Sequence, residues 1–230
     1  QGVSSAASDV YKRQLDYSAR DRLILSKGHA CVSYYSALHL KDFFSRDSLM
    51  TYGQDYSDFM NHASHKVPGV EFSTGALGHG LPYACGKAMA GKRSNDPWHV
   101  FVIVSDGELQ EGSNWEAMLF ASHFNLSNLT ICVDYNNLQS LSTVDETISL
   151  HPLDRKFAAF GWNAYAIDGH DHAQIYDSLL KCKSSSRPSA LILNTVKGKG
   201  VSFMENQVAW HYRSPNEEIY QKALAEIEAS

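Results

Sequence analysis

A strand-helix-strand pattern in the middle of the chain places a polar residue after each of two buried strands. The apolar, β-branched run 100–104 predicts one strand, 129–133 predicts the next, and a helix is expected over 115–124. Asp106 follows the first strand and Asn136 lies just past the second. Because ligands bind at the carboxyl ends of strands in an α/β sheet, we expect these two side chains to meet. A carboxylate and an amide oxygen, with positions left open for phosphate oxygens and water, are what Mg²⁺ prefers.

The rest of the chain continues this alternation. Helices are expected over 30–44, 75–90, 173–183 and 215–229, and strands over 190–196 and at the end of 158–167, after a turn at Gly161. For the last helix, Ser214 is the predicted N-cap and Pro215 the first residue. Residues 86–92 resemble a phosphate-binding loop but lie inside a helical pattern, so we dismiss that motif. The alternation predicts an α/β fold whose mostly parallel sheet is covered by helices on both faces.

Composition excludes several classes of function. A length of 230 residues suits one sizeable α/β domain. The net charge of −5 argues against a nucleic-acid partner, whose binding surface would be basic. No apolar run is long enough to suggest a membrane span. The four cysteines are scattered, and Cys85 and Cys132 lie in apolar surroundings, so we expect buried thiols and a cytoplasmic protein.

Five ordered segments carry a resemblance to a known family. They are 21–30 (DRLILSKGHA), 68–81 (PGVEFSTGALGHGL), the central stretch from Ser105-Asp106-Gly107 to Asn136-Asn137, 168–171 (DGHD), and 197–200 (KGKG) followed by 209–211 (AWH). The central stretch resembles the diphosphate-binding motif of thiamine-diphosphate enzymes. The other segments are similar to those of the transketolase family, and the resemblance runs from about Asp21 to about Glu218.

The resemblance implies thiamine diphosphate and Mg²⁺ (or Ca²⁺ or Mn²⁺) as cofactors. Asp106, Asn136 and the backbone carbonyl of Leu138 would ligate the metal. The alternative for Asp106 is a helix N-cap without metal, a position that Asp favours. Gly107 permits the turn and lets its backbone N–H approach the diphosphate. The resemblance also assigns Glu108 and Leu77 to cofactor binding.

Histidines and one lysine are the remaining site candidates. His29 and His211 match positions that contact cofactor and substrate in the family. His62 is a weaker match, since Asn61-His62-Ala63 stands where the family commonly has Gly-His-Pro. His79 replaces a usual Gln and either lies near the cofactor or satisfies a backbone group. Lys197 either holds a phosphate, supports His211 or is simply solvated.

Glu111 and Glu116 lie five positions apart in the predicted helical region. In the family these positions sit near the subunit interface and help couple protons between two active sites. We rank Glu111 first, as a catalytic candidate. The alternative is a solvated helix face.

The implied function is two-carbon ketol transfer from a ketose phosphate to an aldose, with His29, His62 and His211 shuttling protons. Residues 15–230 would form the diphosphate-binding domain, and 1–14 match nothing in the family pattern and are expected to be extraneous. The chain looks like the N-terminal subunit of a split transketolase, active only with a C-terminal subunit that carries the pyrimidine domain. A homodimer or heterotetramer is expected. The alternatives are another thiamine-diphosphate enzyme of a specialised sugar pathway and a truncated, inactive domain.

Overall fold

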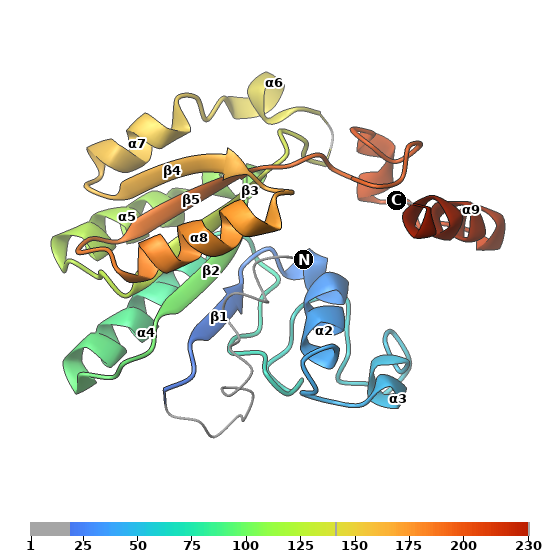
Figure 1. The fold of residues 1–230 in the computed structure, drawn as a ribbon, viewed down its shortest axis with the longest axis horizontal. Coiled ribbons are helices and arrows are strands. Elements are labelled where there is room, and N and C mark those ends of the chain that lie inside the picture. The colour runs from blue at the N-terminus through green and yellow to red at the C-terminus, as the bar shows by residue number, and fades with distance from the viewer. Residues whose placement is uncertain (1–18, 141, 230) are drawn as a thin grey trace.

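The computed structural model describes residues 19–140 and 142–229, so the segment 1–14 lies outside the described residues. Within them, one five-stranded parallel sheet has the order β1-β2-β3-β5-β4 (Figure 1). The strands are β1 (Arg22–Leu25), β2 (Val100–Ser105), β3 (Leu129–Tyr135), β4 (Asn163–Asp168) and β5 (Ser189–Asn194). Arg22 lies opposite Val100, and Val100 opposite Leu129, so the strands start nearly level. The predicted α/β class is confirmed; β1 was not predicted as a strand.

Alternating side chains of the strands feed two cores. Val100, Val102 and Val104 join the core under α4 (Gly80–Ser94), α5 (Gly112–His123) and α7 (Leu153–Ala159). Leu23, Phe101 and Leu191 point the other way, into the core under α2 (Cys31–His39) and α8 (His172–Lys183). Successive strand residues face opposite sides of a sheet, so an apolar run buries both faces. Both faces are therefore covered, as predicted (Figure 1).

Two predicted helices have different limits. The helix expected over 30–44 ends at His39, because the chain turns through Asp42 at φ 61° and Phe43 folds back to donate its N–H to the Leu38 carbonyl. The helix expected from residue 75 begins only at Gly80. Gly78 has φ 86°, a conformation outside the helical region, so the preceding residues stay a loop.

The short α-helices α3 (Arg46–Leu49) and α6 (Val144–Ile148) are among the elements that were not predicted. The last helix, α9 (Glu217–Glu228), starts two residues later than expected because Asn216, not Ser214, caps it by accepting a bond from the Ile219 N–H. The helix extends away from the sheet and buries only Ala223 (Figure 1). Glu226 of α9 accepts bonds from the N–H and hydroxyl of Ser202, which fixes the helix to the segment after β5.

The predictions on cysteines agree with the structure: Cys31, Cys85, Cys132 and Cys182 are all free and buried. The motif at 86–92 lies inside α4, as expected for a chance match. Among the described helices, none combines the length and the apolar character that a membrane crossing requires.

Candidate active site

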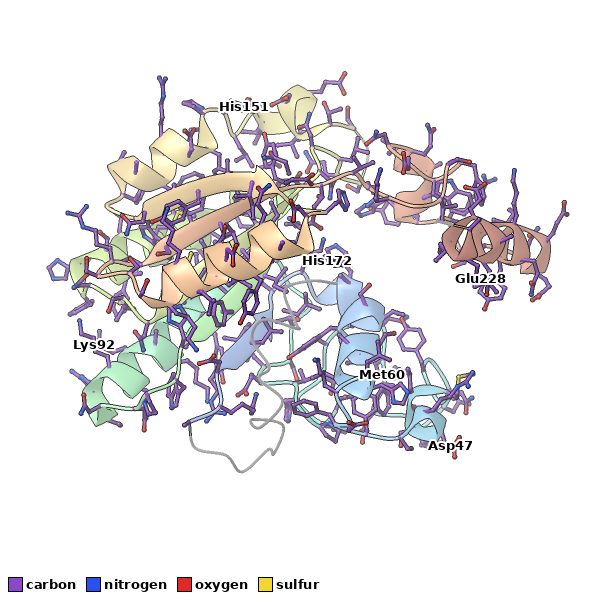
Figure 2. The ribbon with its side chains drawn as sticks, viewed as in Figure 1. Asp47, Met60, Lys92, His151, His172 and Glu228 are labelled. Atoms are coloured by element: carbon purple, nitrogen blue, oxygen red, sulfur yellow. The ribbon has the colours of Figure 1, made fainter. Side chains whose placement is uncertain are left out.

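The candidate residues gather at the carboxyl edge of the sheet, which is the edge where the strands end. Figure 2 labels Lys92 near the end of α4, and His172 at the start of α8, which follows the end of β4 at the carboxyl edge. The Asp106 N–H donates to the Asp134 carbonyl at 3.2 Å, which joins the end of β2 to β3. Asp106 and Asn136 thus lie on neighbouring segments, as the spacing predicted.

Asp106 is a buried carboxylate, with only 1% of its surface exposed. Its Oδ1 accepts a bond from the Gly107 N–H at 2.7 Å, and its Oδ2 accepts one from the Asn137 N–H at 2.6 Å. Burial raises the pKa of Asp106, although these two bonds oppose the rise. A divalent cation at this carboxylate would offset the cost of burying its charge.

The loop after β3 wraps around that carboxylate. Asn136 Oδ1 accepts a bond from the Leu138 N–H at 3.0 Å, and Asn137 takes a left-handed φ of 58°, which Asn tolerates well. The bonds that close the turn use the carbonyls of Ser142 and Asn137 rather than that of Leu138. The Asn136 amide oxygen and the Leu138 carbonyl therefore belong to one short turn beside Asp106.

Two features at this turn fit a metal and a diphosphate. Asn137 Oδ1 and Gln139 Nε2 are buried without a hydrogen-bond partner, and such groups are rare unless a further group satisfies them. A Cβ on Gly107 would lie 3.0 Å from Gln139 Oε1 and would require that amide to shift, so glycine leaves the backbone open there. The oxygens of Asp106, Asn136 and Leu138 are hard donors of the kind Mg²⁺ binds. No cluster of three or more His, Cys, Asp or Glu suited to a metal occurs in the described ranges, and this site needs none.

A cluster of nitrogen groups faces the same edge. The rings of His29 and His211 lie 5.9 Å apart between centroids, and the Lys197 ammonium donates to His211 Nδ1 at 3.2 Å. His62 lies beside Gly75, with its ring 3.8 Å from the position of a Cβ there, and is close enough to influence His29. The structure therefore brings His29, His62, His211 and Lys197 together.

Burial and the neighbouring charges keep His29 and His211 neutral. Partial burial of the ring and the charges of Lys27, His211, Lys197 and His62 lower the pKa of His29 to about 4, although the residue as a whole is exposed. Burial and Lys197 also lower the pKa of His211, and burial together with Lys27 lowers that of Lys197. A neutral imidazole can both accept and donate a hydrogen bond.

Comparison with known proteins identifies the family. The model of the transketolase thiamine diphosphate binding domain matches residues 5–222. The chain belongs to the transketolase family. An apulose-4-phosphate transketolase subunit of Actinobacillus succinogenes is 41% identical over 90% of this chain and 76% of its own length. The 6-deoxy-6-sulfo-D-fructose transketolase subunit SqwG of Clostridium sp. is 38% identical over 91% of this chain and 77% of its own.

Solved transketolases share the fold. The transketolase of Campylobacter jejuni superimposes with a TM-score of 0.92 at 30% identity. The match covers 99% of this chain and 37% of that one, so the chain spans little more than a third of that enzyme. Three relatives, covered to 76%, 74% and 77% of their own length, are named as transketolase subunits, which implies that those proteins work with a partner.

Glu108 has a different place from the one expected of a transketolase cofactor contact. Its carboxylate is fully buried and accepts bonds from the Ser26 hydroxyl, the Gly78 N–H at 2.8 Å and the Ser105 N–H at 3.3 Å. Burial raises its pKa, although these bonds oppose the rise. Glu108 therefore connects three segments beneath the site rather than facing a ligand.

Glu111, Leu77 and His79 lie around one loop. Gly78 sits so close to Glu111 that a Cβ on it would meet the Glu111 Cβ at 2.7 Å, and its carbonyl accepts a bond from the Ser113 hydroxyl. Glu111 and His79 are exposed, and Leu77 is half-buried. The His79 carbonyl accepts a hydrogen bond from the Tyr83 N–H at the start of α4. The structure places these residues, and their roles stay predictions.

Three polar residues of the site were missed from the sequence: Lys27, Asp134 and Thr195. The Lys27 ammonium lies 2.5 Å from Asp134 Oδ2, and the Thr195 hydroxyl donates to Asp134 Oδ1 at 2.5 Å. One signal could have revealed Asp134, a carboxylate directly after the apolar run 129–133. Lys27 and Thr195 resemble ordinary loop residues until the fold brings them together.

Proposed function

We propose that this chain is the diphosphate-binding subunit of a two-subunit transketolase. The assembly would transfer a two-carbon ketol unit from a ketose phosphate to an aldose, using thiamine diphosphate and a divalent cation, most naturally Mg²⁺. The observation that carries the proposal is the buried Asp106 beside the Asn136 turn, at the same edge of the sheet as Lys197, His29 and His211. Membership of the transketolase family supports it.

Each group of residues would have its own task. Asp106, Asn136 and the Leu138 carbonyl would hold the metal, and Gly107 would leave room for the diphosphate. When bound, thiamine diphosphate supplies the carbon nucleophile that carries the two-carbon unit. This chain's residues position it and move protons around it.

The tautomer of His211 follows from its hydrogen bond. Because the Lys197 ammonium can only donate, His211 Nδ1 accepts, and the ring proton lies on Nε2. That N–H would donate to a substrate oxygen as charge develops on it. His29, neutral at pH 7, would accept or return a proton beside it.

The partner would be a C-terminal transketolase subunit with the pyrimidine domain, in a dimeric or heterotetrameric assembly of the cytoplasm. The names of the relatives as subunits support this. The same names specify two particular sugars, apulose-4-phosphate and 6-deoxy-6-sulfo-D-fructose, which favours a specialised sugar pathway over central metabolism.

Calorimetric titration tests the proposal. Thiamine diphosphate is titrated with and without MgCl₂ into the chain, alone and mixed with a C-terminal transketolase subunit, beside Asp106→Asn. We expect metal-dependent binding that weakens at least about 100-fold in Asp106→Asn, since a metal ligand contributes more than the roughly 10–100-fold of its supporting residues. Metal-independent binding, or none with the partner present, would refute the assigned site.

A further inference from the structure

One carboxylate at the carboxyl edge joins three strand ends. Asp134, near the end of β3, accepts the Lys27 ammonium on one oxygen and the Thr195 hydroxyl on the other, both at 2.5 Å. Lys27 follows β1 and Thr195 follows β5. The side chains of Lys27 and Asp134 are only 13% and 27% exposed, so solvent weakens their attraction little.

The three joined residues share a relation to the site. His29 lies two positions after Lys27, Asn136 two after Asp134, and Lys197 two after Thr195. Two residues of backbone allow little independent movement. Fixing the side chains of Lys27, Asp134 and Thr195 therefore also fixes the backbone positions of His29, Asn136 and Lys197.

Asp134 and Lys27 form an ion pair that is largely shielded from water, so the positive charge of Lys27 is held at this edge of the sheet. The same Lys27 charge reaches His29, Lys197 and His211.

We propose that Lys27, Asp134 and Thr195 form a positioning clamp that holds His29, Asn136 and Lys197 in register for cofactor binding. The inference rests on the proposed function, because it assigns these residues to the same site. None of the three needs to touch the reacting atoms. They act through the residues two positions further along.

The competing explanation is an ordinary structural ion pair, and the chain offers a matched example. Lys183 and Asp21 also lie 2.6 Å apart, with side chains 31% and 4% exposed, at the opposite edge of the sheet. Breaking that pair removes a similar interaction far from the site. Lys183→Met is therefore the control for Lys27→Met.

The experiment compares Lys27→Met, Lys27→Arg and Lys183→Met in the full chain with its partner subunit. It measures the affinity for thiamine diphosphate with Mg²⁺ by calorimetry, the melting temperature, and the pKa of His29 by NMR in the cofactor-free chain. We expect Lys27→Met to weaken binding by roughly 10–100-fold, as loss of a residue that orients metal ligands does. The pKa of His29 should rise from about 4, and Lys27→Arg should restore most of both properties.

Lys183→Met should lower the melting temperature and leave affinity and the His29 pKa unchanged. The clamp is refuted if Lys27→Met behaves like Lys183→Met, with affinity within two-fold of the wild type. Should Lys27→Met not fold, Thr195→Val is tested instead, because it removes only the hydrogen bond from the Thr195 hydroxyl to Asp134. Weaker binding at an unchanged melting temperature would then support the clamp, and unchanged binding would refute it. If wild type binds no cofactor, the proposed function fails, while the His29 titration still tests whether Lys27 acts on that residue.

Discussion

The amino and carboxyl edges of the sheet both hold buried carboxylates, but the two edges differ in what neutralises them. At the amino edge, Asp21 accepts the Lys183 ammonium at 2.6 Å and the His99 N–H at 2.9 Å. Glu71 pairs there with Arg20 and lies 3.8 Å from Arg22. At the carboxyl edge, Asp106 makes no ion pair within residues 19–140 and 142–229, and burial raises its pKa. The chain itself supplies cations for Asp21 and Glu71 at the amino edge and for Asp134 at the carboxyl edge, whereas the proposed function leaves Asp106 to a metal ion.

His29 at the carboxyl edge and His99 at the amino edge differ in the same way. The pKa values of His29 and His99 are both lowered to about 4. His99 is 4% exposed, donates its backbone N–H to Asp21, and has its ring bonded to Thr130, so burial accounts for its pKa. His29 is exposed, and its pKa is lowered by partial burial of the ring and by neighbouring charged residues, Lys27 first among them. One histidine belongs to the fold, and the other stands where a ligand can reach it.

The largest expected effect is that of Asp21→Asn, which should lower the free energy of unfolding without changing cofactor affinity. Asp21→Asn keeps an oxygen for the His99 N–H but leaves the Lys183 ammonium without its partner. We expect the free energy of unfolding to fall by about 3 kcal/mol, the lower end for breaking a buried pair, since Lys183 is partly exposed. Chemical denaturation measures it, and calorimetry should find cofactor affinity unchanged. Asp106→Asn is the control, because it should weaken cofactor binding. A loss of cofactor affinity in Asp21→Asn would contradict the inferred difference between the two edges.

A smaller effect depends on pH. Because the pKa of His99 is about 4 in the folded chain and about 6.5 in the unfolded one, the unfolded chain binds more protons between these values. Stability therefore falls as pH drops through this window, and His99 should account for about 2 kcal/mol of loss by pH 5.

Denaturation at pH 7 and pH 5 measures this loss. His99→Gln should remove that part of the pH dependence, whereas His29→Gln should change cofactor binding as well. If the free energy of unfolding falls equally between pH 7 and pH 5 in the wild type and in His99→Gln, His99 does not titrate as inferred.

The smallest effect concerns α6, beside the metal turn. Thr143 and Glu146 form a capping box at its start, and Asp145 accepts a bond from the Asn137 side chain at 3.2 Å. Thr143→Ala should destabilise α6 locally by about 1 kcal/mol. We expect faster amide exchange over 144–148 and a few-fold loss of cofactor affinity. Ser45→Ala, which removes the cap of α3, is the matched control and should leave affinity unchanged.

Apolar pattern predicted the strands better than the limits of the helices. The runs 100–104 and 129–133 became β2 and β3 because buried parallel strands need apolar residues on both faces. The helix expected from residue 75 began at Gly80 because Glu108 and Ser113 hold Gly78 in a loop. Those two partners lie 30 and 35 positions away, so local propensity carried no sign of them.

The sequence by itself determined the α/β alternation, the polar residues that follow the strands, and the meeting of Asp106 with the turn at Asn136. These follow from periodicity and from the rule that parallel strands end at one edge. Only the tertiary structure decided that Glu108 is an internal connection, and that Asp134 joins Lys27 to Thr195. Such roles depend on which distant segments become neighbours and on which groups lose their water. Neither is written in the spacing of residues along the chain.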